Sequence, residues 1–165
     1  MPTAVRSWRT PLLAAIGVGS LLALAAALVA QHGFGMEPCA WCVIQRIVVI
    51  ALAVVGLGGA ALARRWPRGA GLPAGAVLLA LSVGGAWAAW HQHTVASRQL
   101  SCAFTWADRT LMAVQLDAWM PAVFRVGATC ADAAGATLLG LSFEVWSGAW
   151  FALVAAAALA ALRAR

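Results

Sequence analysis

Four blocks of apolar residues, each about as long as a membrane-spanning helix, set the pattern of this chain. A spanning helix needs about 20 residues at a rise of about 1.5 Å each. The bilayer core cannot hydrogen-bond free backbone groups, so each block is predicted to be a helix. Arg46 is the one charge within the blocks, which are 12–30, 43–63, 71–90 and 145–162. The sequence therefore predicts an all-α membrane protein, with a bundle of four transmembrane helices in a single membrane domain over 1–165.

The composition agrees with this pattern. Apolar residues make up 64% of the chain and charged residues 10%, whereas a soluble domain has about a quarter charged residues. The first block could instead be a signal peptide, because Arg6 and Arg9 precede it. It is longer than a usual signal-peptide core, and no clear cleavage site follows before Gln31. We therefore expect the first block to be a retained helix.

The arginines predict the orientation, because the chain has no lysine. Seven of the eleven arginines lie before the first helix, between the second and third, or at the end of the chain: Arg6, Arg9, Arg64, Arg65, Arg68, Arg163 and Arg165. The positive-inside rule makes that side cytoplasmic, with both termini. Loops of about 31–42 and 91–144 then lie on the far side. The net charge of +6 reflects this topology, and a nucleic-acid surface is disfavoured because the basic residues are split among short segments.

The cysteines all fall in the two far-side loops, at Cys39, Cys42, Cys102 and Cys130. An even number on an oxidising side indicates disulfides. We expect the pairs Cys39–Cys42 and Cys102–Cys130, although the sequence allows three connectivities. A bridge as short as Cys39–Cys42 constrains little and is easily reduced, which favours a redox role over a structural one. The residues alone favour a structural bridge for Cys102–Cys130, and no metal site is expected because a second C-x-x-C is missing.

The residues around the C-x-x-C motif suit a reactive thiol. Pro38 should hold the chain extended, so that Cys42 lies near a helix N-terminus, where backbone N–H groups and the helix dipole favour a thiolate. Arg46 comes four residues later on the same helical face. It would stabilise the Cys42 thiolate and an anionic, reduced cofactor, or it would serve as an interfacial anchor. Gln45 could add a hydrogen bond or face lipid.

Two further features lie in the long loop. Leu116–Phe124 can place its apolar side chains on one face, which predicts a short helix on the membrane surface, with a packed loop fragment as the alternative. His91 and His93 open the loop, and either could carry a proton near neutral pH. A solvated loop histidine is the alternative for both.

Taken together, these residues resemble the DsbB family of disulfide bond formation proteins. The motif Pro38-Cys39-x-x-Cys42-x-x-x-Arg46 is similar to the quinone-linked site of that family. The stretch from Leu116 to Phe124, followed by Cys130-Ala131, resembles its second extracytoplasmic loop, and Leu139-Gly140-Leu141 before the last helix also fits. The resemblance covers most of the chain. It implies a bacterial inner-membrane protein with its active loops in the periplasm.

The resemblance also implies a role for each site residue. Cys39 and Cys42 would pass electrons to ubiquinone or menaquinone, with Cys42 contacting the quinone and Arg46 binding it. Cys102 would be attacked by a reduced DsbA-like periplasmic oxidoreductase, with Cys130 as its disulfide partner. His93 matches a family position close to the quinone. Gln45 departs from the pattern, because a familiar member has an acid there, and the segment from Cys102 to Asp117 matches poorly.

Two other functions remain open from the sequence. A reductase of the vitamin K epoxide reductase type also combines a helical bundle, a C-x-x-C motif and a quinone, but its motif lies late in the chain. A membrane scaffold with structural disulfides would keep its function when a C-x-x-C thiol is replaced. The sequence favours a quinone-dependent protein-thiol oxidoreductase over both.

Overall fold

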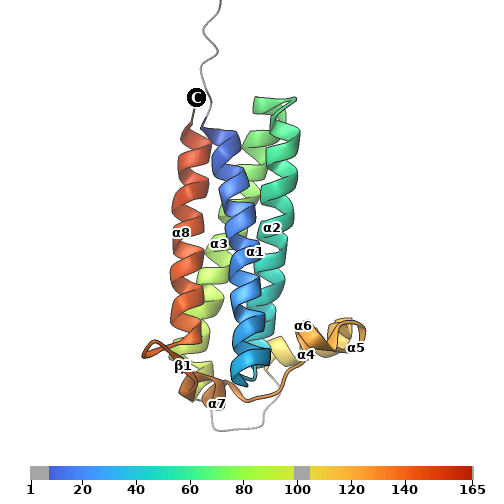
Figure 1. The fold of residues 1–165 in the computed structure, drawn as a ribbon, viewed down its shortest axis with the longest axis vertical. Coiled ribbons are helices and arrows are strands. Elements are labelled where there is room, and N and C mark those ends of the chain that lie inside the picture. Colours follow the sequence, from blue (N-terminus) through green and yellow to red (C-terminus); the bar gives the residue numbers. More distant parts are fainter. Residues whose placement is uncertain (1–7, 99–104, 165) are drawn as a thin grey trace, which may run out of the picture.

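The computed structural model describes residues 8–98 and 105–164, which form a bundle of four long helices (Figure 1). These helices are α1 (Arg9–Phe34), α2 (Ala40–Ala63), α3 (Pro67–Thr94) and α8 (Phe143–Arg163). Around the bundle, α1 packs on α2, α2 on α3, α3 on α8, and α8 on α1. All four are long and apolar enough to cross a membrane. The chain is a multi-pass membrane protein, and the predicted all-α four-helix class is confirmed.

At the end of the bundle where the C-x-x-C motif lies, the helices continue beyond the apolar blocks of the sequence. Helix α3 runs to Thr94, and the N–H of Val95 still donates to the His91 carbonyl at 2.9 Å. His91 and His93 therefore belong to the last turn of α3, not to the following loop as expected. Charge and polarity mark where the apolar core of the bilayer ends, whereas a helix can continue into polar surroundings as long as its backbone bonds form.

The segment between α3 and α8 packs at one end of the bundle (Figure 1). Its described elements are the 3₁₀ turn η1 (Ala96–Arg98), the helices α4 (Trp106–Val114), α5 (Leu116–Trp119), α6 (Pro121–Phe124) and α7 (Cys130–Gly135), and the strands β1 (Thr137–Leu138) and β2 (Leu141–Ser142). The expected short amphipathic helix is two separate turns, because the backbone leaves the helical region at Met120 (φ −139°, ψ 71°). Pro121 then starts the second turn, where its missing N–H is not needed. Contact of this segment with the membrane surface stays a prediction.

A tight hairpin leads into α8. Thr137 pairs with Ser142 and Leu138 with Leu141, in antiparallel register. Leu139 and Gly140 turn the chain with φ of 54° and 81°, the left-handed pair that a two-residue hairpin requires. Trp146 in α8 donates from Nε1 to the Leu138 carbonyl at 3.0 Å. The hairpin is thereby held against the start of α8.

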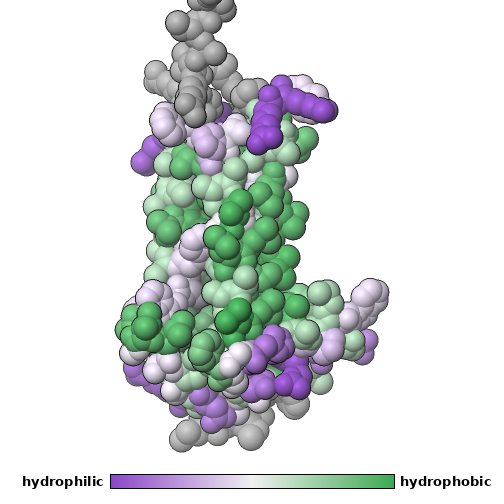
Figure 2. All heavy atoms as spheres, viewed as in Figure 1, coloured by the Kyte–Doolittle hydropathy of each residue, from purple (hydrophilic) through white to green (hydrophobic). Residues whose placement is uncertain are grey.

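The buried side chains form two clusters, one within the bundle and one at its cysteine end. The first includes Leu13, Ile16, Leu52, Leu78, Phe151 and Val154. The second includes Cys39, Trp41, Val43, Ala107, Leu111 and Phe124. The outer flank of the bundle is apolar between two polar ends (Figure 2). The long helices therefore present an apolar belt to lipid and share a packed interior.

Arg9 joins the first and last helices at the end opposite the cysteines. Its Nε donates to the Ala161 carbonyl at 3.0 Å, and its Nη2 donates to the Ala164 carbonyl at 2.5 Å. A cation is favourable at the C-terminus of a helix, where the carbonyls have no helical partner. Arg64 and Arg65 follow α2 at the same end of the bundle (Figure 1). The side of the membrane on which this end lies stays a prediction.

Helices α1 and α2 come into backbone contact where two glycines face each other. A Cβ added to Gly56 would lie 2.7 Å from the Gly17 nitrogen and 2.8 Å from its Cα. Small residues allow such approach between membrane helices, whose association relies on close packing. Gly58, two residues along α2, has open space at the same position.

We predict that Gly56→Ala destabilises the bundle by about 1–3 kcal/mol, because the added methyl group meets backbone that cannot move aside. Gly58→Ala is the matched control. It should be neutral or stabilising by up to about 1 kcal/mol, since alanine favours helix more than glycine does. Unfolding in mixed detergent, followed by circular dichroism, measures both. Equal stability of the two variants would contradict the contact.

Candidate active site

The C-x-x-C motif begins α2. Cys39 is the N-cap residue, with an extended backbone (φ −86°, ψ 172°), and Cys42 lies in the first turn. In this structure both are thiols, with their Sγ atoms 3.2 Å apart. A disulfide has a length of about 2.05 Å, so the bond can form with a small movement. Cys39 is fully buried, whereas Cys42 is partly exposed.

Two loops that are distant in sequence are tied together beside Cys39. The Pro38 carbonyl accepts hydrogen bonds from the backbone N–H groups of Gly127 and Ala128, at 3.0 Å and 3.3 Å. An ion pair of 3.0 Å between Arg125 and Glu37 adds a second connection. These contacts fix the approach to α7, which starts at Cys130.

As a result, Cys39 contacts two thiols rather than one. Its Sγ lies 3.2 Å from Cys42 Sγ, and Cys130 packs against the same buried cluster, close enough to change the pKa of Cys39. The hydrogen bond with Cys130, then that with Cys42 and burial, raise the pKa of Cys39. The same bond with Cys39 lowers the pKa of Cys130 against the opposing effect of burial. Cys39 therefore keeps its proton, while Cys130 is favoured as a thiolate. Cys102, its expected disulfide partner, lies outside the described residues.

Arg46 lies one helical turn after Cys42 in α2 and is buried. Its Nη1 donates to Gln31 Oε1 at 2.5 Å and to the Val123 carbonyl at 2.8 Å. A charge at this depth needs such partners. Arg46 therefore connects α2 with the end of α1 and with α6, in addition to facing the same cavity as Cys42.

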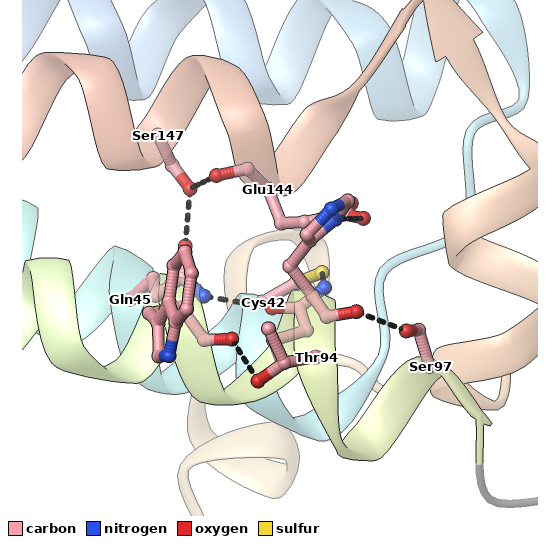
Figure 3. Close-up of polar contacts among 9 residues, drawn as sticks. Cys42, Gln45, Thr94, Ser97, Glu144 and Ser147 are labelled. Atoms are coloured by element: carbon pink, nitrogen blue, oxygen red, sulfur yellow. Dashed lines mark hydrogen bonds and ion pairs between the residues drawn. The ribbon is translucent and has the colours of Figure 1, made fainter.

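A chain of hydrogen bonds leads away from Cys42 through α3 and α2 to α8 (Figure 3). Gln92 donates from Nε2 to Cys42 Sγ at 3.2 Å, and its Oε1 accepts from Gln45 Nε2 at 2.7 Å. Ser147 donates to Gln45 Oε1. Gln45 thus faces the bundle interior rather than lipid. An amide donor at Cys42 Sγ suits a sulfur that carries negative charge.

The chain of polar groups ends at Glu144, where Ser147 meets the backbone carbonyl and His93 meets the carboxylate. Ser147 Oγ lies 3.0 Å from the Glu144 carbonyl, and Glu144 Oε1 lies 3.2 Å from His93 Nδ1. The Glu144 side chain is 1% exposed and that of His93 is 53% exposed. His93 is therefore next to the site through Glu144. His91 lies elsewhere, with its ring 4.6 Å from that of Trp41 and 5.4 Å from that of Trp87, measured between centroids.

A cavity of about 230 Å³ opens beside Cys42, between α1, α2 and α8. The wall from α1 is mostly alanine, and Trp150 of α8 adds apolar surface. Cys42, Gln45, Arg46, Glu144 and Ser147 line its polar end. Of the cysteines in the described part of the chain, Cys42 alone lines this cavity.

The structure adds residues that sequence analysis missed. Three buried polar residues belong to the site: Gln31, Gln92 and Glu144. Gln31 accepts a hydrogen bond from Arg46, Gln92 donates one to Cys42, and Glu144 lines the cavity. Each lies within two residues of the end of an apolar block. This position was the sequence signal that could have identified them, because a polar residue at the end of a membrane helix can face the protein interior where it finds a hydrogen-bond partner.

Comparison with known proteins agrees with this architecture. The family described as disulfide bond formation protein DsbB matches residues 9–161. A protein of Pseudomonas aeruginosa named disulfide bond formation protein B 2 is 37% identical, over 88% of this chain and 88% of its own length. Proteins named disulfide bond formation protein B from Herminiimonas arsenicoxydans and Neisseria meningitidis are 32% and 36% identical, over 88% and 82% of this chain and 89% and 84% of their own lengths.

The family match covers nearly the whole chain, including the region of all four apolar helices. It sets aside the vitamin K epoxide reductase and scaffold alternatives and supports a disulfide-forming oxidoreductase. This chain belongs to the DsbB family of disulfide bond formation proteins.

Proposed function

We propose that the protein oxidises a DsbA-like dithiol oxidoreductase in the bacterial periplasm and passes the electrons to a membrane quinone, ubiquinone or menaquinone. The observation that carries this proposal is the position of Cys39 between Cys42, which lines the cavity, and Cys130, which lies in the outer loop. Thiol–disulfide exchange needs a thiolate next to a sulfur of the bridge that it attacks. The contacts of Cys39 provide such a sequence of neighbours.

The cavity suits a quinone head group. Its volume of about 230 Å³ exceeds the roughly 150 Å³ of a cavity that holds benzene. Alanine and tryptophan side chains supply an apolar wall, and Arg46 supplies a cation at the polar end. When bound, a quinone accepts two electrons and two protons. Cys42 and Arg46 would hold it, with Cys42 as the nearest donor.

The chain's own sulfurs define the route of the electrons. The thiolate of the partner protein attacks Cys102 of the Cys102–Cys130 bridge, which releases Cys130 as a thiolate. Cys130 then attacks Cys39 of the Cys39–Cys42 bridge, so that a Cys39–Cys130 bond forms and Cys42 leaves as a thiolate. The second thiol of the partner then displaces Cys102 from the mixed disulfide and leaves the partner oxidised. The freed Cys102 attacks Cys130 of the Cys39–Cys130 bond, which restores the Cys102–Cys130 bridge and leaves Cys39 and Cys42 reduced. Reoxidation of Cys39 and Cys42 to their disulfide would pass two electrons to the membrane quinone.

The charges support an inner-membrane orientation. The cysteine end of the bundle lies opposite the end with Arg9, Arg64 and Arg65 (Figure 1). Arginine-rich ends face the cytoplasm by the positive-inside rule. The thiols would then face the periplasm, which is the oxidising side on which disulfides form.

We predict that Cys42→Ser abolishes quinone reduction, because the replaced sulfur is the one at the cavity. Quinone absorbance in detergent, with a reduced DsbA-like donor, measures this loss. Cys130→Ser is the matched control. It should also stop the reaction with the protein donor, yet keep quinone reduction by dithiothreitol, which can reduce Cys39–Cys42 directly. Wild-type rates in Cys42→Ser would contradict the proposal, and so would an inactive wild type with both quinones.

The second prediction concerns the lowered pKa of Cys130 in the reduced protein. Only the thiolate reacts with iodoacetamide, so the rate should fall as the pH drops through this lowered pKa. Cys39→Ala removes the hydrogen bond that lowers the pKa, so the midpoint should move up and the rate at pH 7 should fall severalfold. Cys42→Ala is the control, because charge at Cys42 raises the pKa of Cys130. Its midpoint should stay or move down, and mass spectrometry of the labelled peptide follows each case.

We also expect Arg46→Gln to raise the KM for quinone about tenfold or more, since hydrogen bonds to charged groups contribute about 1.5–3 kcal/mol. Arg125→Gln removes a cation from the same end of the bundle, but one that is 61% exposed. Its KM should change less than about fivefold, because exposed ion pairs contribute about 1 kcal/mol or less. Steady-state kinetics with varied quinone compares the two. Equal changes would remove the assigned role of Arg46.

A further inference from the structure

Glu144 is a buried acid with one oxygen that is not hydrogen-bonded within the described part of the chain. Its side chain is 1% exposed. Oε1 lies 3.2 Å from His93 Nδ1, whereas Oε2 is buried and has no partner among the described residues. A buried carboxylate oxygen without a partner is costly. Because Glu144 lines the cavity beside Cys42, this oxygen is suited to bind a group held there.

The proposed reaction requires a proton that the two thiols do not supply. Cys42 reacts as a thiolate and Cys39 as a thiol, so formation of their disulfide releases two electrons and one proton. Reduction of a quinone to a hydroquinone takes up two electrons and two protons. A second proton must therefore reach the cavity each time the disulfide forms.

We propose that Glu144 donates this second proton to the acceptor beside Cys42, and that His93 then returns a proton to Glu144 from water. The inference rests on the proposed quinone-linked function. In the balanced step, a quinone, the Cys39 thiol, the Cys42 thiolate and the protonated Glu144 give a hydroquinone, the Cys39–Cys42 disulfide and the Glu144 carboxylate. Protonated His93 then restores Glu144 and takes its next proton from solvent.

The other polar groups of the cavity are less suited to this role. Gln45 and Ser147 are neutral, and neither has an exchangeable charge at physiological pH. Arg46 cannot be deprotonated in a protein. Glu37 also lines the cavity, and its Oε2 is likewise buried without a partner among the described residues, but its side chain is 38% exposed and Oε1 is paired with the Arg125 cation. Among the described lining residues, Glu144 is the only acid that is closed off from water and paired with a titratable side chain.

The positions of Glu144 and His93 suit their proposed roles as proton donor and as relay from water. Glu144 lies in the first turn of α8, where the helix dipole stabilises the carboxylate that remains after donation. The side chain of His93 is 53% exposed, so its ring is accessible to solvent protons. Its position in the last turn of α3 is held by Ser97, which donates from Oγ to the His93 carbonyl at 2.7 Å. A proton can thus cross from water to the cavity through one buried carboxyl group.

A purely structural pair would also join α3 to α8, so the first test reads protonation directly. We would record infrared difference spectra between the oxidised and reduced states of the quinone-loaded protein. The wild type should show a carboxyl band that Glu144→Gln loses and that Glu37→Gln keeps. Persistence of the band in Glu144→Gln would overturn the inference, because a different acid would then carry the proton.

The second test is chemical rescue, and it does not depend on the folding of a Glu144 variant. His93→Ala removes the residue that returns the proton, so single-turnover quinone reduction should slow about a hundredfold, a typical contribution of acid–base catalysis. The substitution also leaves space at the surface in which imidazole can bind. Added imidazole should restore most of that rate. His32→Ala is the control, because His32 is exposed and contacts the Ala122 carbonyl at 2.8 Å instead of Glu144. Any loss in this variant should not respond to imidazole.

The outcomes separate this inference from the proposed function. Rapid quinone reduction by the wild type, with equal rates in His93→Ala and Glu144→Gln, would overturn the proton route and leave the function intact. A slow His93→Ala variant that imidazole does not restore would reduce the pair to a structural contact and also overturn the route. A wild type that reduces no quinone would overturn both.

Discussion

A bilayer core offers no hydrogen bonds, and this constraint shapes both the backbone and the polar surroundings of Cys42. The backbone must satisfy itself, which requires helices across the apolar belt. Polar side chains that enter the bundle must find partners inside it, as Gln45 does with Gln92 and Ser147. The partners of Gln45 lie at the cysteine end, so this buried network also surrounds Cys42.

Outside the helices, a few backbone contacts create the redox arrangement. The Pro38 carbonyl accepts hydrogen bonds from the backbone N–H groups of Gly127 and Ala128. These bonds hold the start of α7, with Cys130, near Cys39. The C-x-x-C motif on a rigid helix provides a fixed target, while the loop supplies the second thiol. The described part of this loop is held at the motif by backbone hydrogen bonds and one ion pair rather than by a membrane helix.

The thiols differ because their surroundings differ. Burial and two thiol neighbours keep Cys39 protonated, while the donated hydrogen bond favours the thiolate of Cys130. Exchange is favoured when the attacking sulfur is a thiolate and the sulfur that it attacks is within reach. Cys42 is the described cysteine that meets the cavity, with Arg46 beside it and Glu144 opposite on α8. In the proposed route, electrons would therefore enter the motif at Cys39 and leave it at Cys42.

The sequence by itself determined the four helices, the cysteine-bearing side and the pairing of Cys42 with Arg46 on one face of α2. These depend on local rules, namely the length of an apolar block and the 3.6-residue period of a helix. Only the tertiary structure decided that Cys130 meets Cys39, that Gln45 turns inwards and that Glu144 reaches the cavity. Each of these contacts joins residues on different elements. His93 and Glu144 are 51 positions apart in the sequence, and Gln45 and Ser147 are 102 positions apart. Helical periodicity and block length carry no information about which distant face a polar side chain will meet, because that depends on how the loops close and how the helices pack.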